Sequence, residues 1–330
     1  MIPLGETPKP PAQPLPFLGG VGALRRDPAW LLPLPFVAYF TAVALAGELR
    51  WDHWALLIVV IALASGGARS KKLLLGLYPI GLVALVYDAM RYVKDWGVSP
   101  ERVHDCDLHA LELGLFGFTA GGARVTLGDW FLTHHATALD LYCAVPYGTF
   151  IFACIAAAVV LYFRDYRALL RFTWIFFAMN VAAFATYHLY PAAPPWYFHA
   201  HGCEVSMTAL PSAGPRLAHV DEVLGIHYFA GIYGRSSDLY GAVPSLHVAY
   251  PLLIVLEGWR SFRWPGRALT LVFCASMSFA AVYLDHHWII DVLLGYAYCL
   301  TARALVRFIE ARLATAPAAP TLAIDQGPGG

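Results

Sequence analysis

The chain contains eight apolar stretches that are long enough, or nearly long enough, to cross a lipid bilayer as helices. A spanning helix needs ~20 apolar residues, because the bilayer offers no water and every backbone amide must be bonded within its own segment. Six stretches are secure on length alone, whereas the second is short enough to be re-entrant and the sixth contains Pro251. The stretches are 29–48, 54–68, 73–93, 139–163, 168–190, 243–259, 268–284 and 288–307.

The composition supports a membrane protein and excludes most soluble classes. Hydrophobic residues make up 59% of the 330 residues and charged residues 13%, against roughly 45–50% and about 25% in soluble domains. A disordered chain would be far less hydrophobic. Basic and acidic residues balance at 22 each, so there is no basic excess with which to bind nucleic acid. We expect an all-α fold, a polytopic transmembrane bundle of about 6–8 helices, with loops or interfacial helices covering its outer face.

Lysine and arginine predict how the bundle is oriented. If the N-terminus is cytoplasmic, 15 of the 22 basic residues fall in inner segments and six in the longer outer segments, with Arg91 at the outer end of the third stretch. This asymmetry is the positive-inside pattern. All 13 histidines lie in outer loops or near the outer ends of the stretches. The sequence therefore predicts a multi-pass integral membrane protein with a titratable site on its non-cytoplasmic face.

The same features divide the chain into five segments. They are a cytoplasmic N-terminal tail (1–28), N-terminal spans (29–93), an outer interfacial segment (94–138), the bundle that carries the motifs described below (139–313) and a cytoplasmic C-terminal tail (314–330). Leu108–Phe118 is apolar but too short to span, which favours an interfacial helix. Cys106 and Cys203 both fall in outer segments, the oxidising side in most cells, and a disulfide between them remains open. Cleavage of the first stretch as a signal after Ala44-Leu45-Ala46 is a rival interpretation, disfavoured by the 28 residues that precede the stretch.

Two short stretches at the outer face carry histidine and aspartate together. Gly241-Ala-Val-Pro-Ser-Leu-His247 leads into the sixth apolar stretch, and Tyr283-Leu-Asp-His-His-Trp-Ile-Ile-Asp-Val292 leads into the eighth. His287 and Asp291 are four residues apart, so they share one face of a helix. A carboxylate in that position can accept the Nδ1 proton of the imidazole and leave Nε2 as a nucleophile or base. His247 begins another span at the same depth and is placed to face them.

Other interpretations of these residues are possible. Interfacial histidines are often only solvated, but an aspartate one turn inside a span costs ~2.5–3.5 kcal/mol and needs a partner. His247, His286, His287 and Asp291 are of the types that bind zinc, although no cysteine or further carboxylate lies close in sequence. A lipid transporter with a proton relay is a further alternative, disfavoured because the set lies at one face and no internal repeat is visible.

The two stretches resemble the second and third signature motifs of the type-2 phosphatidic acid phosphatase superfamily. The form Gly-Ala-Val-Pro-Ser-Leu-His of the first, with His-His-Trp in the second, is similar to the inositol phosphorylceramide synthase branch of that superfamily. The resemblance covers roughly residues 85–305. It extends to Tyr190–Trp196 and to the stretch from Asp88 and Arg91 to Leu115-Phe116-Gly117.

This resemblance implies a covalent phosphotransfer that needs no metal or organic cofactor. It assigns attack on phosphorus to His287, the orientation of that imidazole to Asp291, and acid–base catalysis to His247. The implied partners are a phospholipid donor, which supplies a phosphoinositol-like group, and a ceramide-like or other lipid alcohol as acceptor. If water takes the place of the acceptor, the chain is instead a lipid-phosphate phosphatase, which is the alternative within the enzyme class.

The chain departs from the phosphatase pattern in its cations. Phosphatases of the superfamily carry Ser-Arg beginning seven residues before the nucleophile, whereas this chain has Ala280 and Ala281 there. Their first motif, a Lys and an Arg-Pro pair, is not found before the Pro-rich segment. Another group must stabilise the charge that develops on the phosphoryl group. The candidates for binding phosphate or substrate are Arg91, Ser245, Arg235 and Lys94.

Overall fold

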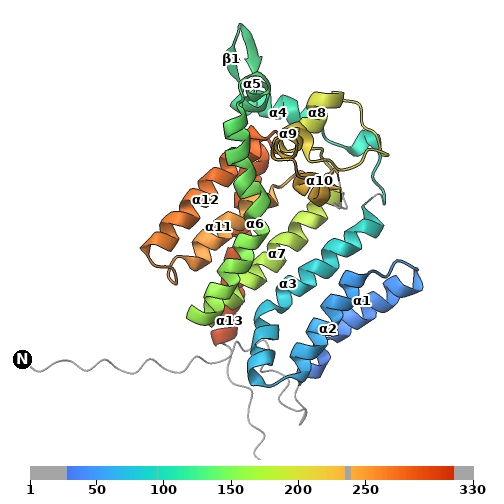
Figure 1. Cartoon of the computed structure of the whole chain (residues 1–330), viewed down its shortest axis with the longest axis vertical. Helices are drawn as coiled ribbons and strands as arrows, with labels where there is room; N and C mark the ends of the chain where they lie inside the picture. The colour runs from blue at the N-terminus through green and yellow to red at the C-terminus, as the bar shows by residue number, and fades with distance from the viewer. Residues whose placement is uncertain (1–27, 95, 235–238, 316–330) are drawn as a thin grey trace, which may run out of the picture.

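The computed structural model describes residues 28–94, 96–234 and 239–315, which form a bundle of long helices beneath a layer of short ones (Figure 1). Within these residues, five helices are long and apolar enough to cross a membrane. They are α3 (Ala68–Val93), α6 (Thr137–Arg164), α7 (Tyr166–Leu189), α12 (Trp264–Tyr283) and α13 (Ile289–Thr315). The predicted all-α, polytopic fold is therefore confirmed.

Three apolar helices are shorter than a full span. They are α1 (Leu34–Leu45), which follows the 3₁₀ turn η2 (Pro28–Leu31), α2 (Trp51–Ser65) and α11 (Leu246–Gly258). We expected the first of them to span fully, but α1 has only 12 residues, or ~18 Å of helix against a hydrocarbon core of ~30 Å. Pro33 and Pro35 explain the late start, because proline is accommodated at the beginning of a helix and not in its interior.

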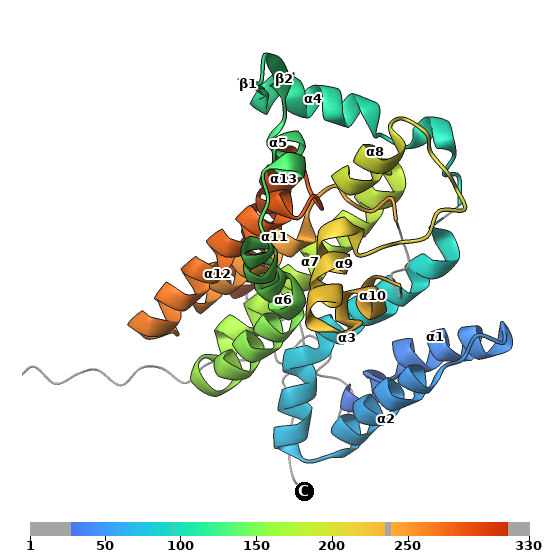
Figure 2. The ribbon, with the colours of Figure 1, turned by 45° about the horizontal axis from the view of Figure 1, so that its top comes forward.

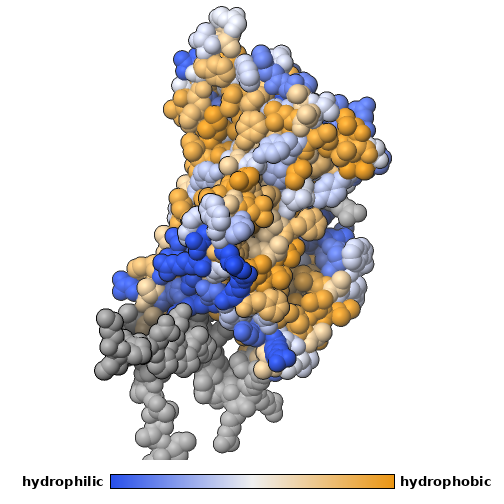
Figure 3. All heavy atoms as spheres, turned by 60° about the vertical axis from the view of Figure 1, so that its left-hand side comes forward, coloured by the Kyte–Doolittle hydropathy of each residue, from blue (hydrophilic) through white to orange (hydrophobic). Residues whose placement is uncertain are grey.

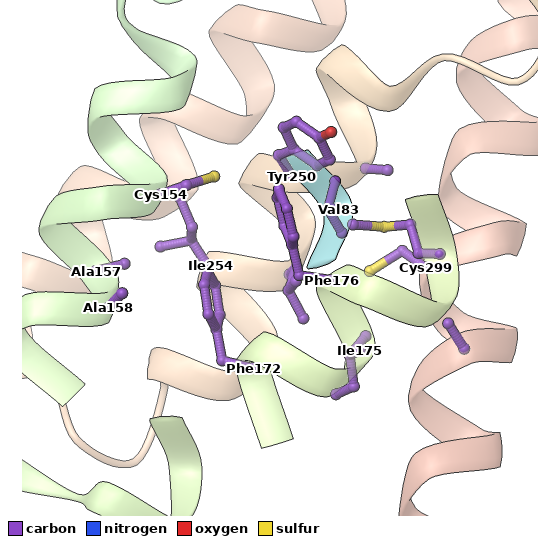
Figure 4. Close-up of a cluster of buried hydrophobic side chains, with 14 of the residues drawn as sticks. Val83, Cys154, Ala157, Ala158, Phe172, Ile175, Phe176, Tyr250, Ile254 and Cys299 are labelled. Atoms are coloured by element: carbon purple, nitrogen blue, oxygen red, sulfur yellow. The ribbon is translucent and has the colours of Figure 1, made fainter. Parts of the chain in front are cut away.

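Helix α7 occupies the centre of the bundle and packs against α3, α6, α11 and α13. Its buried side chains recur at helical spacing, as in Leu169, Phe172, Phe176 and Met179. Figure 4 shows part of this core, in which Phe172 and Phe176 lie near Tyr250 of α11 and other buried side chains. The core therefore fixes α11, whose second residue is the predicted site residue His247, against its neighbours.

A buried carboxylate joins three helices at the end of the bundle opposite the histidines. Glu257 of α11 is 3.0 Å from Arg171 of α7, and 2.7 Å and 3.5 Å from Arg303 and Arg307 of α13. A buried charge needs partners of this kind, since its desolvation is costly. Figure 3 shows that the flank of the molecule is largely hydrophobic, with a hydrophilic patch towards its lower end.

Short elements form a layer over the other end, which comes forward in Figure 2. The helices are η3 (Pro100–Arg102), α4 (Cys106–Phe116), α5 (Leu127–Thr133), α8 (Pro195–His201), α9 (Gly214–Leu224) and α10 (Tyr228–Tyr233), and the strands are β1 (Phe118–Ala120) and β2 (Ala123–Val125). Helix α4 confirms that the apolar run from Leu108 is helical, although it ends at Phe116. The hairpin of β1 and β2 was not predicted; its signal is Gly121-Gly122, whose positive φ angles suit a two-residue turn.

A disulfide closes this layer. Cys106, at the start of α4, is bonded to Cys203, just beyond α8, with their Cα atoms 5.5 Å apart. The bond joins two segments that are 97 residues apart in sequence. The sequence left open whether these two cysteines are bonded, and the structure shows that they are.

Candidate active site

The predicted nucleophile stands on a tight turn between two long helices. His287 lies between the end of α12 and the start of α13, and its backbone N–H donates to the carbonyl of Ala281, as does that of His286. Asp285 adopts a left-handed backbone (φ 67°), which is uncommon for a residue with a side chain. The carbonyl of Asp285 accepts a hydrogen bond from Trp196 of α8. The turn is thus held from both its own helix and the outer layer.

The structure brings His247, His287 and Asp291 together. The Nδ1 atom of His247 lies 3.1 Å from Nε2 of His287. On the other side of the same imidazole, Nδ1 of His287 lies 3.5 Å from Oδ2 of Asp291, which is an ion-pair distance but too long for a good hydrogen bond. This network favours a proton on Nδ1 of each histidine, an assignment made from partners because hydrogens are not observed. Nε2 of His287 then carries the lone pair.

The two motifs also touch through their backbones. The N–H of Ser245 donates to the carbonyl of Asp291 at 3.1 Å, and the hydroxyl of Ser245 is fully buried without a hydrogen-bond partner among the described residues. One turn further along α13, Gly295 lies so close to Ser245 that an added Cβ would be 2.2 Å from its carbonyl oxygen. Only glycine permits this approach. The distance between the histidines is therefore set by a contact between α11 and α13.

Two cavities meet at the histidine pair. The larger, of about 450 Å³, is enclosed by α3, α6, α7, α10 and α11 and is mostly apolar. It reaches the outside of the bundle, because two of its lining residues, Tyr87 of α3 and Ile151 of α6, are 44% and 52% exposed. The smaller, of about 120 Å³, lies below the outer layer, and its lining includes Trp196 and Ser212. His247 and His287 line both cavities, so the two rings are accessible from two sides.

The predicted phosphate-binding cations are not at the histidines in the described part of the chain. No lysine or arginine is among the described residues that line either cavity. Arg91 is 42% exposed and lies 3.8 Å from Asp88, which also pairs with Arg50. Lys94 follows the end of α3, and Arg235 falls outside the described residues. Phosphate binding by these three residues stays a prediction.

Sequence reasoning missed a charged histidine in the outer layer. The ring of His199 in α8 lies between two carboxylates, with Nε2 at 2.9 Å from Asp129 of α5 and Nδ1 at 2.8 Å from Asp285. Burial lowers the pKa of His199, but the hydrogen bonds and charges of the two carboxylates outweigh it and raise the pKa to about 9. The network ties α5 and α8 to the turn that carries His287. Of the three residues in this network, only Asp285 lies within one of the two motif stretches.

A buried glutamate, Glu112, caps the N-terminus of α13, the helix that carries Asp291. Glu112 of α4 is 1% exposed, and its two carboxylate oxygens accept the N–H groups of Ile289 and Ile290, at 2.9 Å and 3.1 Å. These amides belong to the first turn of α13, where a negative charge is favoured by the helix dipole. Burial raises the pKa of Glu112. The sequence placed Glu112 in an interfacial helix without indicating this partner.

The remaining motif histidine is held away from the pair. Nε2 of His286 donates to the carbonyl of Ala213 at 2.9 Å. Burial lowers the pKa of His286 to about 3, so the ring is neutral. Within the described residues, no group of three His, Cys, Asp or Glu side chains is arranged to hold a metal ion.

The fold and this set of side chains define a class of membrane enzyme. The chain belongs to the PAP2 superfamily, whose family model matches residues 122–305, more than half of its length. The predicted family is thereby confirmed. No solved structure matches the chain.

Curated relatives narrow the class to lipid headgroup transferases. The chain is 35% identical to the phosphoinositol dihydroceramide synthase of Bacteroides thetaiotaomicron over 76% of its own length and 82% of that protein. It is 30% identical to the inositol phosphorylceramide synthase of Candida albicans, and 28% identical to the catalytic subunit of that enzyme from Saccharomyces cerevisiae. The fungal matches cover 52% and 51% of this chain but only 36% and 42% of the fungal proteins.

Proposed function

We propose that the chain moves a phosphoinositol-like group from a phospholipid to a ceramide-like lipid alcohol, through a phosphohistidine intermediate. The observation that carries this proposal is the match to a phosphoinositol dihydroceramide synthase across most of both chains. The geometry supports it, because the histidine pair lies where an apolar cavity that reaches the outside of the bundle meets a smaller one under the outer layer.

In the first step, Nε2 of His287 attacks phosphorus and the bond from phosphorus to the diacylglycerol oxygen breaks. The leaving oxygen takes the Nδ1 proton of His247, which in the free enzyme faces the attacking nitrogen at 3.1 Å. The donor phosphate must therefore replace the hydrogen bond between the two histidines when it binds. Asp291 stabilises the positive charge that forms on the ring of His287.

In the second step, the lipid alcohol takes the place of diacylglycerol. His247, now without its Nδ1 proton, accepts the proton of the alcohol, whose oxygen attacks phosphorus. The bond from phosphorus to Nε2 of His287 breaks, and its electron pair returns to the ring. Both enzyme residues regain their initial states, so the cycle consumes only the two lipids.

We place this chemistry on the non-cytoplasmic side of the membrane. The Lys/Arg asymmetry of the sequence supports this orientation. The disulfide between Cys106 and Cys203 supports it as well, because it lies in the same outer layer as the site and disulfides persist in oxidising compartments. A cysteine introduced at Gly121, at the tip of the β1–β2 hairpin, should react with an impermeant thiol reagent in intact cells. Labelling only after permeabilisation would overturn the orientation.

The function is tested with purified protein and phosphatidylinositol labelled in the inositol ring, with and without ceramide. We expect labelled inositol phosphorylceramide from the wild type and none from His287→Ala. Release of inositol phosphate in the presence of ceramide would instead identify a hydrolase in which water takes the place of the lipid alcohol. Rapid quenching into alkali, which preserves a phosphoramidate, should trap labelled wild-type protein and no labelled His287→Ala. Trapping on His287→Ala but not on His247→Ala would reverse the two roles.

A further inference from the structure

A buried tyrosine lies against the histidine pair from a helix that carries neither motif. Tyr147, in α6, stacks on His247 with ring centroids 4.6 Å apart and planes 17° from parallel. Its ring is also 5.1 Å from that of His286. The residue is 2% exposed and lines the larger cavity. Stacking against His247 leaves the ring little freedom, so the position of its hydroxyl is fixed relative to the site.

The hydroxyl of Tyr147 differs from those of two other buried tyrosines in this part of the bundle, Tyr250 and Tyr283. It is buried and has no hydrogen-bond partner among the described residues. By contrast, the hydroxyl of Tyr283 donates to Asp140 at 2.6 Å, and that of Tyr250 donates to Asn180 at 2.6 Å. A buried hydroxyl without a partner destabilises a protein. Its position beside the proposed catalytic pair points to a partner that arrives with the substrate.

The proposed phosphotransfer also needs a hydrogen-bond donor that can stabilise negative charge on the phosphoryl oxygens. A phosphoryl group in transfer carries charge on its non-bridging oxygens, and enzymes stabilise that charge with preorganised donors. The alanine at position 281 occupies the place of the arginine in phosphatases of the superfamily, and it is fully buried. No lysine or arginine lines either cavity among the described residues. A neutral hydroxyl costs less to bury beside an apolar cavity than a cation does.

We propose that the hydroxyl of Tyr147 donates a hydrogen bond to a non-bridging oxygen of the transferred phosphoryl group. Tyr147 is then a catalytic residue, and this inference rests on the proposed phosphotransfer. The tyrosine keeps its proton throughout, and its hydrogen bond strengthens as negative charge develops on the oxygen. Because the donor is neutral, it does not oppose protonation of the neighbouring His247, whereas an arginine in the same place would.

The test is Tyr147→Phe, which keeps the stacked ring and removes only the hydroxyl. We expect kcat to fall ~10²-fold, the lower end of the scale for losing one preorganised donor, with KM little changed. The melting temperature should stay the same or rise, because the variant removes an unpartnered buried group. Tyr78→Phe is the matched control, since the hydroxyl of Tyr78 donates to the carbonyl of Leu32, away from both cavities, and its kcat should equal that of wild type. A wild-type kcat in Tyr147→Phe, or a fall in kcat together with a lower melting temperature, overturns the proposal.

A second measurement separates this inference from the proposed function. Orthovanadate, which becomes five-coordinate when a nucleophile binds it, is titrated into each protein in detergent and followed by thermal shift. We expect it to bind wild type and to bind Tyr147→Phe at least tenfold more weakly. If wild type binds vanadate but transfers no lipid headgroup, the proposed function fails, and the ratio of the two affinities still decides the role of Tyr147. Equal affinities overturn that role, and a wild type that does not bind vanadate overturns both proposals.

Discussion

Replacing Gly295 with alanine should separate the two halves of the active site. The added Cβ would lie 2.2 Å from the carbonyl oxygen of Ser245 and 2.8 Å from Cγ2 of Val248, whereas ordinary contacts begin at 3.4 Å. A backbone carbonyl cannot rotate away as a side chain can. Helices α11 and α13 must therefore move apart by about 1 Å at this level.

The size of the effect follows from what the two helices carry. His247 lies two residues beyond Ser245, and His287 lies two turns before Gly295, with their ring nitrogens now 3.1 Å apart. Inserting a methyl group into a packed core costs ~1–3 kcal/mol. A displacement of ~1 Å at reacting groups costs ~10² in rate. We expect Gly295→Ala to lower both the melting temperature and kcat, with the larger effect on kcat.

The assay compares thermal unfolding in detergent with headgroup transfer from phosphatidylinositol to ceramide. Gly114→Ala is the control, because Gly114 lies within helix α4 and an added Cβ there meets nothing within 4 Å. Alanine is the better helix former by ~0.5–1 kcal/mol, so this control should be neutral or slightly stabilised. A Gly295→Ala protein with wild-type melting temperature and turnover would refute the argument that this contact sets the histidine distance.

Three further predictions concern the outer layer. Glu112→Gln removes the charge from the N-terminus of α13, which should cost ~1–2 kcal/mol and lower the melting temperature; an unchanged value would mean that the cap contributes nothing. Raising the pH should weaken the layer, because the pKa of His199 is about 9 in the folded protein against 6.5 for the free group. Its stabilisation is complete below pH 6.5 and is lost as the pH rises through about 9, so melting temperatures should fall over that range in wild type and less in His199→Gln. Replacing Cys106 and Cys203 together by serine opens a loop of 97 residues, and the chain-entropy scale of ~4–5 kcal/mol predicts a fall of several degrees; equal melting of the variant and wild type would contradict it.

The sequence predicts those parts of this molecule that depend on neighbours along the chain. Apolar length identified the long helices. The spacing of four residues between His287 and Asp291 correctly predicted that they lie near one another, at 3.5 Å, but only Asp291 is on α13, whereas His287 lies in the turn before it. The pairing of His247 with His287 was inferred from equal depth in two spans, and the structure brings their nitrogens to 3.1 Å. The contact between His287 and Asp291 was predicted from their spacing in sequence, and the contact between His247 and His287 from the depth of both residues in the bilayer.

What the sequence did not reveal depends on contacts between distant segments. Glu112 meets the amides of α13 from 177 residues away, and Asp129 meets His199 across 70. Neither carboxylate has a spacing that singles it out from a solvated surface residue. Gly295 lies one turn beyond the stretch that contains His287 and Asp291, but its contact with Ser245 depends on the packing of α11 against α13. The reacting histidines could therefore be found from local sequence motifs. The residues that hold the site in place, such as Glu112 and Asp129, become recognisable only when the outer layer is folded.

In the proposed reaction, the balance between transfer and hydrolysis should depend on which cavity delivers the acceptor. If the second step is as proposed, we expect a lipid alcohol to reach His247 through the larger cavity, past Tyr87 and Ile151, and water to reach it through the smaller cavity under the outer layer. The smaller cavity is bounded by Trp196 and by the turn before His287, both of which the outer layer holds in place. Loosening that layer should therefore shift the balance from transfer towards hydrolysis before it abolishes turnover. If a phosphohistidine forms as proposed, a rigid outer layer would keep water from it, and the disulfide, the cap by Glu112 and the charged His199 all make that layer rigid.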